Sequence, residues 1–379
     1  MENKNRYLCS VCNREYPVDT REFRCRCGGP FELDRDPRFF SISTLQGRET
    51  SIWRYRESIP IENDRNIISL GEGFTPLVPF SYGELKKILL KLDYLCPTGS
   101  YKDRGTSVLI SKLKENGITR CIADSSGNAG SSIAAYAVRA GIECKIYCPA
   151  YTSEGKLVQI KAYGAQLVKI PGTRADTAAA VQEEAKKVFY ASHNWNPFFS
   201  EGIKTMAFEI CEQLGWTAPD VVLCPAGYSG IYIGLYQGFK ELVDHGLIAQ
   251  IPRLVGVQSE AVSPIYQAFN RRSREVDEVP SQTTLAEGIA CVKPVRGKKI
   301  LEIARLTRGC FEIVSEKEIM EGWQDLARVG IYVEPTSAVV IKAVERLARK
   351  GLLNSQESIV LILTGIGLKA TDTLGKYVG

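Results

Sequence analysis

The sequence has very little histidine and no long hydrophobic run. Its 379 residues include only two histidines, His193 and His245, so the catalytic chemistry has to be sought mainly in other residue types. We expect His245 at the surface and a structural role for His193. No apolar run approaches the roughly 20 residues that a membrane-spanning helix needs. The N-terminus, residues 1–6, is polar and no apolar core follows it, which argues against a signal peptide and predicts a cytoplasmic protein.

A strong charge of either sign is also absent. The formal net charge is +5, with 44% hydrophobic and 24% charged residues, as in ordinary soluble globular proteins. This mild positive charge is compatible with a small phosphorylated substrate. There is no stripe of basic and aromatic residues, which argues against a nucleic-acid partner. The length of 379 residues exceeds that of a usual single domain and predicts two or three domains.

Short apolar runs alternate with helical patterns from about residue 86 onward. Six of these runs are rich in β-branched residues and nearly continuous: Cys144–Cys148, Leu167–Ile170, Val221–Leu223, Leu254–Val257, Phe311–Val314 and Ile359–Leu363. Such runs between helices are typical of parallel strands that are buried on both faces of a sheet. The pattern therefore predicts an α/β fold.

Lys102 stands in a turn that contains glycine and serine, residues 97–105 (Pro-Thr-Gly-Ser-Tyr-Lys-Asp-Arg-Gly). Residues 90–94 before the turn alternate like a half-buried strand, with Lys91 and Asp93 as the polar members. Residues 108–113 after it have helical spacing, so Lys102 is predicted to open a helix, whose N-terminus favours an anionic ligand. A desolvated lysine at such a place can form a Schiff base. Taken alone, however, the turn fits an ordinary solvated lysine better.

Three further turns of small residues follow apolar runs. They are residues 125–130 (Ser-Ser-Gly-Asn-Ala-Gly), 225–230 (Pro-Ala-Gly-Tyr-Ser-Gly) and 364–367 (Thr-Gly-Ile-Gly). The first lets a planar ligand approach the backbone, and the second is typical of a phosphate-binding turn at a helix start. Each turn alone is weak, because α/β proteins use such turns for packing. Four of them in this order, with a lysine in the first, indicate a cofactor site.

In this order the four turns resemble the fold type II family of pyridoxal-phosphate enzymes, and most closely the threonine synthases. Residues 70–77 (Leu-Gly-Glu-Gly-Phe-Thr-Pro-Leu), 334–338 (Glu-Pro-Thr-Ser-Ala) and 364–369 (Thr-Gly-Ile-Gly-Leu-Lys) are also similar to that family, so the likeness covers nearly the whole chain. It implies a tryptophan synthase β-like fold: two parallel-sheet α/β domains with pyridoxal 5'-phosphate in the cleft between them. The smaller domain is expected over residues 94–187, and the larger one over 36–93 and 188–379.

The resemblance also implies roles for individual residues. Lys102 is implied to be the catalytic Schiff-base lysine, Asn128 to contact the phenolic oxygen of the cofactor, and Thr364 to face the pyridine nitrogen. Ser125 and Ser126 would help to bind the substrate carboxylate. The cofactor phosphate would be held by Gly227, Tyr228, Ser229, Gly230 and Ile231. A homodimer is implied as well.

The implied reaction converts O-phosphohomoserine and water into threonine and phosphate, the work of a carbon–oxygen lyase. The likeness is weaker at Phe74, Cys96, Ala129, Phe199, Ser200 and Ile366. Phe199 and Ser200 stand where an arginine commonly holds the substrate phosphate, and the candidate replacements are Lys156, Lys161, Arg174 and Lys204. Three alternatives stay open: β-replacement on O-phosphoserine (a cysteate synthase-like activity), serine or threonine deamination, and an inactive zinc-ribbon interaction protein.

The chain has twelve cysteines, which should be mostly reduced in the absence of a secretion signal. Cysteines in apolar patterns are expected in the core: Cys121, Cys144, Cys148, Cys211 and Cys224. Residues 1–35, a stretch too small for a core of its own, contain two close pairs: Cys9 with Cys12, and Cys25 with Cys27. Two such pairs predict a structural zinc site in a zinc-ribbon-like segment, although the second pair has one intervening residue instead of two. A degenerate ribbon without metal is the alternative.

Overall fold

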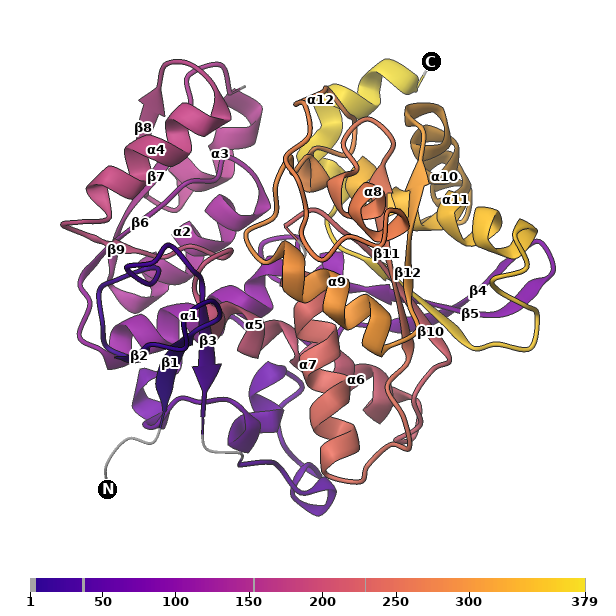
Figure 1. Cartoon of the computed structure of the whole chain (residues 1–379), viewed down its shortest axis with the longest axis horizontal. Coiled ribbons are helices and arrows are strands. Elements are labelled where there is room, and N and C mark those ends of the chain that lie inside the picture. The colour runs from indigo at the N-terminus through magenta and orange to yellow at the C-terminus, as the bar shows by residue number, and fades with distance from the viewer. Residues whose placement is uncertain (1–4, 36–37, 153, 229, 379) are drawn as a thin grey trace. The chain divides into compact units, whose positions relative to one another are not determined.

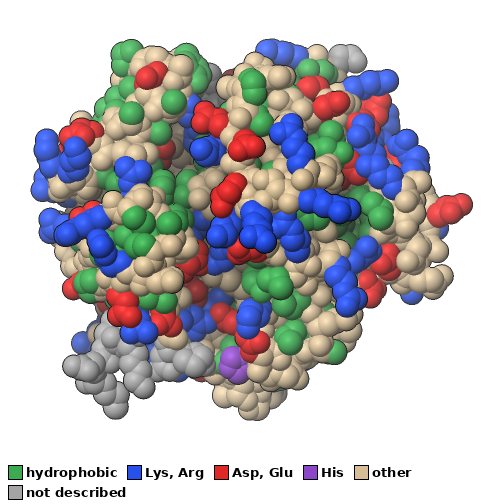
Figure 2. Space-filling model, in the orientation of Figure 1, with side chains coloured by type: hydrophobic (Ala, Val, Ile, Leu, Met, Phe, Trp, Pro, Cys, Tyr) green, Lys and Arg blue, Asp and Glu red, His purple; other side chains and the backbone are tan. Residues whose placement is uncertain are grey.

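The structure is a computed structural model that describes residues 5–35, 38–152, 154–228 and 230–378. The chain divides into two compact units (Figure 1). Unit 1 comprises Met1–Gly73, Cys96–Thr98 and Lys102–Ile203, and unit 2 comprises Phe74–Leu95, Gly99–Tyr101 and Lys204–Gly379. On the face shown in Figure 2, basic and acidic side chains are interspersed. Among the described residues, no helix is long and apolar enough to span a membrane.

Unit 1 begins with a small antiparallel sheet of three strands. Its order is β2 (Glu15–Pro17), β1 (Arg6–Cys9) and β3 (Phe31–Asp34). The Tyr7 ring stacks on Phe31, with ring centroids 5.2 Å apart, and meets the ring of Phe198 edge-on at 6.0 Å. The N-terminal sheet therefore shares a core with a helix that lies almost 200 positions later, which compensates for its small size.

The rest of unit 1 is an α/β layer around a four-stranded parallel sheet. The strand order is β8 (Gln166–Ile170), β7 (Glu143–Pro149), β6 (Arg120–Ala123) and β9 (Phe189–Tyr190). The helices are α1 (Lys102–Glu115), α2 (Asn128–Ala140), α3 (Glu154–Ala162), α4 (Arg174–Glu184) and α5 (Pro197–Ile203).

Unit 2 is built on a six-stranded sheet. Its order is β12 (Cys310–Val314), β11 (Arg253–Ser259), β10 (Val221–Pro225), β13 (Ile359–Leu363), β5 (Leu85–Leu92) and β4 (Leu77–Tyr82). All neighbours are parallel except β4 and β5, which form an antiparallel pair at one edge. The helices are α6 (Thr205–Gln213), α7 (Gly230–Asp244), α8 (Pro264–Asn270), α9 (Gly297–Leu306), α10 (Glu316–Arg328), α11 (Pro335–Arg349) and α12 (Thr371–Leu374).

Both faces of the unit 2 sheet are buried. Leu361 and Leu363 of β13 belong to one core cluster with residues of α10 and α11. Val360 and Ile362 alternate with them along the strand and therefore point to the opposite face, yet they are also fully buried. The prediction of an α/β fold with parallel strands is confirmed, and the central strands β10 and β13 are covered on both sides, whereas β8, at the edge of the unit 1 sheet, is only partly buried. The five cysteines expected in the core are buried as well.

The half-buried character expected for residues 90–94 was wrong. Lys91 and Asp93 are both fully buried. Lys91 Nζ lies 2.9 Å from the Glu209 carboxylate and donates to Thr75 O, while the Thr75 hydroxyl donates to Asp93 at 2.7 Å. Lys91 and Asp93 can be buried because each has a buried partner that replaces its water.

Candidate active site

Lys102 is the first residue of α1, and the turn before it is anchored by Asp103. The Asp103 carboxylate accepts hydrogen bonds from Thr98 N at 2.7 Å and from the Thr98 hydroxyl at 2.6 Å. It also accepts from the Ser132 hydroxyl of α2 at 2.6 Å. Asp103, in the first turn of α1, thus ties the lysine turn to the neighbouring helix α2. The Lys102 side chain is half-buried on this anchored backbone.

The turn with Ser125, Ser126 and Asn128 connects β6 to α2. Asn128 is the first residue of the helix, and the N-cap Gly127 has no side chain to bond the first N–H groups. The Ser125 hydroxyl accepts from Gly127 N at 3.3 Å. Because α1 and α2 pack together through Asp103 and Ser132, unit 1 brings this turn and the lysine turn close together. A helix start with few competing acceptors is suited to an anionic or polar ligand group.

The third turn connects β10 to α7. A Cβ on Gly227 would lie 2.7 Å from Ile289 Cα, so only glycine fits at this close backbone approach. Tyr228 is half-buried, Gly230 opens α7, and Ile231 is buried. Ser229, also expected to bind phosphate, lies outside the described residues. The turn leads into the N-terminus of α7, a helix of fifteen residues whose dipole favours an anion at this end.

The fourth turn follows β13 and begins with Thr364. Its hydroxyl lies 2.9 Å from the Ser337 hydroxyl of α11, and its carbonyl accepts from Tyr101 N at 3.0 Å. Since β10 and β13 are adjacent parallel strands in register, with Leu223 opposite Leu361, their carboxyl ends lie side by side. Unit 2 therefore places the third and fourth turns at one edge of its sheet, where ligands of α/β proteins commonly bind.

Sequence reasoning did not assign roles to Ser337 and Asp103, which hold two of the turns. Ser337 Oγ accepts hydrogen bonds from the backbone N–H groups of Thr364 and Gly365, each at 2.9 Å. Both supporting residues lie inside the motifs noted above, and this was the available signal. The partner of Ser337 could not be read from the motifs, because Ser337 and Thr364 are 27 positions apart.

Phe199 and His193 lie beside Lys102 within unit 1. The Lys102 ammonium is 5.8 Å from the Phe199 ring centroid, and the His193 ring meets Phe199 edge-on at 5.8 Å. Burial, together with the positive charges of Lys102 and Arg174, holds the pKa of His193 well below its ordinary range. His193 is therefore neutral at physiological pH. His245 is exposed, as expected.

Two of the cations suggested as phosphate ligands have carboxylate partners. Lys204 is fully buried, and its Nζ lies 3.0 Å from Glu241. Lys161 pairs with Glu154 on the surface. Arg174 is the first residue of α4 and exposed, and the side chain of Lys156 lies outside the described residues. Among the other positions that differ from the family pattern, Cys96 and Ala129 are buried.

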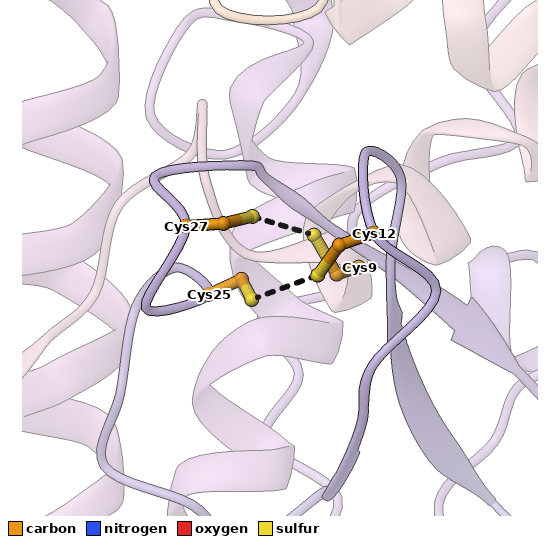
Figure 3. Close-up of side chains that lie close together, drawn as sticks. All are labelled: Cys9, Cys12, Cys25 and Cys27. Carbon is orange, nitrogen blue, oxygen red and sulfur yellow. Dashed lines mark hydrogen bonds between the residues drawn. The ribbon is translucent and has the colours of Figure 1, made fainter.

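The four N-terminal cysteines form one cluster, and Figure 3 shows their sulfur atoms pointing toward one another. The Sγ atoms of Cys9 and Cys27 lie 3.4 Å apart, those of Cys12 and Cys25 lie 3.5 Å apart, and all four are within 4.8 Å. The Tyr16 hydroxyl donates to Cys25 Sγ at 3.3 Å and lowers the pKa of Cys25 to about 6. Tetrahedral zinc with Zn–S bonds of about 2.3 Å separates its sulfurs by about 3.8 Å, which this arrangement matches.

Comparison with known proteins identifies relatives over nearly the whole chain. Residues 68–365 match the family model described as pyridoxal-phosphate dependent enzyme. The chain is 37% identical to a threonine synthase of Methanocaldococcus jannaschii over 96% of its length and 93% of that protein. It is 32% identical to a threonine synthase of Methanosarcina acetivorans, over 97% and 92%. Among solved structures, a T.th. threonine deaminase matches with a TM-score of 0.67 and 26% identity, over 86% of this chain and 98% of that one.

Proposed function

The chain belongs to the family of pyridoxal-phosphate dependent enzymes, and we propose that it is a threonine synthase. It would convert O-phosphohomoserine and water into threonine and phosphate. The observation that carries this proposal is the match to relatives named threonine synthase over more than nine-tenths of both chains. These relatives do not favour β-replacement on O-phosphoserine, deamination or a role as an inactive interaction protein.

The residues of the four turns suit pyridoxal 5'-phosphate. At Gly227 a Cβ would meet the backbone of Ile289, so only glycine fits in the turn that leads into α7, and the N-terminus of that helix favours a phosphate. Lys102 would bind the cofactor covalently, Asn128 would bond its ring oxygen, and Thr364 would face its ring nitrogen. The phosphate would be held by Gly227, Tyr228, Gly230 and Ile231, with Ser229 as a further candidate.

When bound, this cofactor supplies an electron sink for the charge that develops at the substrate Cα. The Lys102 amine would accept the Cα proton and move a proton at Cβ, so a single lysine can serve as base and shuttle without histidine. Ser125 and Ser126 would bind the substrate carboxylate at the start of α2. Thr364 is neutral and held by Ser337, so it would offer the ring nitrogen a hydrogen bond without a negative charge, which suits elimination better than transamination.

The cysteine cluster supports a second part of the proposal, a structural zinc ion. Four cysteine sulfurs at tetrahedral separations form a closed set, with no position open for a substrate. Cys9, Cys12, Cys25 and Cys27 would join two loops of a segment whose own core is small. The ion would thereby stabilise the ribbon without taking part in the reaction.

Three further expectations are carried forward as proposals. The substrate would be a small phosphorylated amino acid, the protein would be a homodimer, and it would be located in the cytoplasm. Analytical ultracentrifugation and fractionation of the native host would test the last two.

The deciding experiment measures phosphate release by the purified protein, with the amino-acid products identified. O-phosphohomoserine, O-phosphoserine, serine and threonine are supplied separately. Threonine and phosphate in equal amounts from O-phosphohomoserine are expected. Activity only on O-phosphoserine, or oxoacid formation from serine or threonine, would replace the proposed reaction with one of the alternatives.

A further inference from the structure

Helices α1 and α5 of unit 1 pack with glycine at the contact. A Cβ on Gly105 of α1 would lie 2.7 Å from three ring atoms of Phe199, and a Cβ on Gly202 of α5 would lie 2.0 Å from Arg104 O. Each glycine thus makes room for an atom of the other helix. The Phe199 ring is only 1% exposed and rests directly on the backbone of α1.

The same ring faces the lysine of the proposed cofactor site. Lys102 and Gly105 are three positions apart on α1 and therefore share one face of the helix. The Phe199 ring, 5.8 Å from Lys102 Nζ, covers both residues. As the Lys102 amine accepts a proton, the positive charge that develops at this distance is attracted to the electron-rich face of the ring.

His193 also contacts the Phe199 ring. Its own ring is inclined by 63° to that of Phe199, in an edge-on contact. Since burial keeps this imidazole neutral, it does not place a second positive charge next to Lys102. Phe199 is thus held by Gly105 and His193, and the rigid ring forms an apolar wall beside the flexible lysine side chain.

We infer that Phe199 is a positioning residue for Lys102: its clamped ring restricts the lysine side chain and holds the amine in the direction that proton transfer needs. The inference rests on the proposed role of Lys102. A lysine side chain has four rotatable bonds, and proton transfer requires its nitrogen within hydrogen-bond distance of the substrate carbon's proton. Restricting those rotations before the reaction lowers the barrier without a new contact to substrate.

Phe198 provides a matched control on the same helix. It is fully buried, and its ring centroid lies 5.3 Å from the ammonium of Lys112, a lysine of α1 ten positions beyond Lys102. Phe198→Leu therefore removes the same atoms and the same type of cation–ring contact. It does so in the core shared with Tyr7 and Phe31, away from the proposed cofactor lysine.

The experiment compares the holoenzyme forms of wild type, Phe199→Leu and Phe198→Leu. Thermal unfolding reports the packing loss, the visible absorption band reports the lysine-bound cofactor, and kcat and KM for O-phosphohomoserine report the reaction. We expect both variants to unfold at lower temperature. Only Phe199→Leu should alter the absorption band and lower kcat, by about 2- to 30-fold, the range expected for one cation–ring contact, with KM little changed.

Fluorinated phenylalanine at position 199 makes the test independent of packing. Fluorine atoms withdraw charge from the ring face while nearly preserving its shape, so kcat should fall stepwise with the number of fluorines. The same substitution at position 198 should leave kcat unchanged. Equal kcat and equal absorption bands in the two leucine variants would overturn the inference. A wild-type protein without the absorption band would instead contradict the proposed function itself.

Discussion

The hydroxyl oxygens of Ser337 and Thr364 lie 2.9 Å apart in the buried interior of unit 2. The Ser337 oxygen also accepts the backbone N–H groups of Thr364 and Gly365. One side chain at the start of α11 thus fixes both the backbone and the hydroxyl of the turn after β13. Because Thr364 is proposed to face the cofactor ring, this contact connects the packing of unit 2 to cofactor binding.

Ser337→Ala should weaken both stability and cofactor binding. It leaves two buried N–H groups without their acceptor, at a cost of about 2 kcal/mol in the free energy of unfolding, and it frees the Thr364 hydroxyl to rotate. Urea unfolding of the cofactor-free protein and titration with pyridoxal 5'-phosphate measure the two effects. An unchanged cofactor affinity would show that the Ser337–Thr364 contact supports the fold alone.

Lys102→Ala should abolish the visible absorption of the bound cofactor and all turnover. The side chain is half-buried, so the free energy of unfolding should change by less than about 1 kcal/mol. Lys114→Ala, at an exposed position of the same helix, is the control and should keep both properties. Turnover retained by the Lys102 variant would refute the catalytic assignment.

Replacing Cys9 and Cys12 with serine should remove the zinc ion, because two remaining thiolates cannot complete a tetrahedral site. Elemental analysis of the purified protein should fall from one zinc per chain to none. Cys310→Ser, a half-buried cysteine outside the cluster, should keep the metal. If the double variant and the wild type contain the same amount of zinc, the ion is not held by these cysteines.

Glu209→Gln should strongly destabilise unit 2. The change leaves the fully buried Lys91 ammonium without its opposite charge and should lower the free energy of unfolding by about 3–5 kcal/mol. Asp244→Asn, which breaks the exposed Lys240–Asp244 pair, should cost less than about 1 kcal/mol. Denaturant unfolding measures both, and comparable small losses would mean that water reaches the Lys91–Glu209 pair.

Glu318 should make stability depend on pH in the acid range. Burial raises the pKa of Glu318, but the hydrogen bonds from Arg346 and Ser315 outweigh it, so the pKa is lowered overall. A lowered folded-state pKa gives stability that is complete above the unfolded-state value of about 4.3 and is lost as the pH falls through the folded-state value.

The free energy of unfolding of wild type should therefore exceed that of Glu318→Gln by about 1–2 kcal/mol at pH 7. The difference between the two should shrink below about pH 4. Unfolding by urea between pH 3 and 7 measures it. Glu321→Gln, in the exposed Lys317–Glu321 pair of the same helix, should show little change with pH. A Glu318 difference that stays constant or grows in acid would contradict the assignment of this carboxylate.

Local patterns in the sequence were sufficient to predict the alternation of strands and helices and the four small-residue turns. The strands β7, β8 and β10 to β13 all coincide with apolar runs. Burial on both faces explains the runs of β10 and β13, which are buried throughout, whereas β8 is only partly buried. The position of Lys102 at the start of α1 was equally readable, because the turn and helix signals are close neighbours in the chain. These features depend on interactions within a few residues.

Contacts between distant segments were decided only by the tertiary structure. Lys91 looked like an exposed strand residue because its partner, Glu209, is 118 positions away. In the sequence, Phe199 indicated only the loss of an arginine that commonly binds the substrate phosphate. In the structure, the Phe199 ring rests on Gly105 beside Lys102. A side chain's role depends on what surrounds it in space. The sequence determined which chemical groups the protein has and where each element begins, and folding decided which of those groups meet.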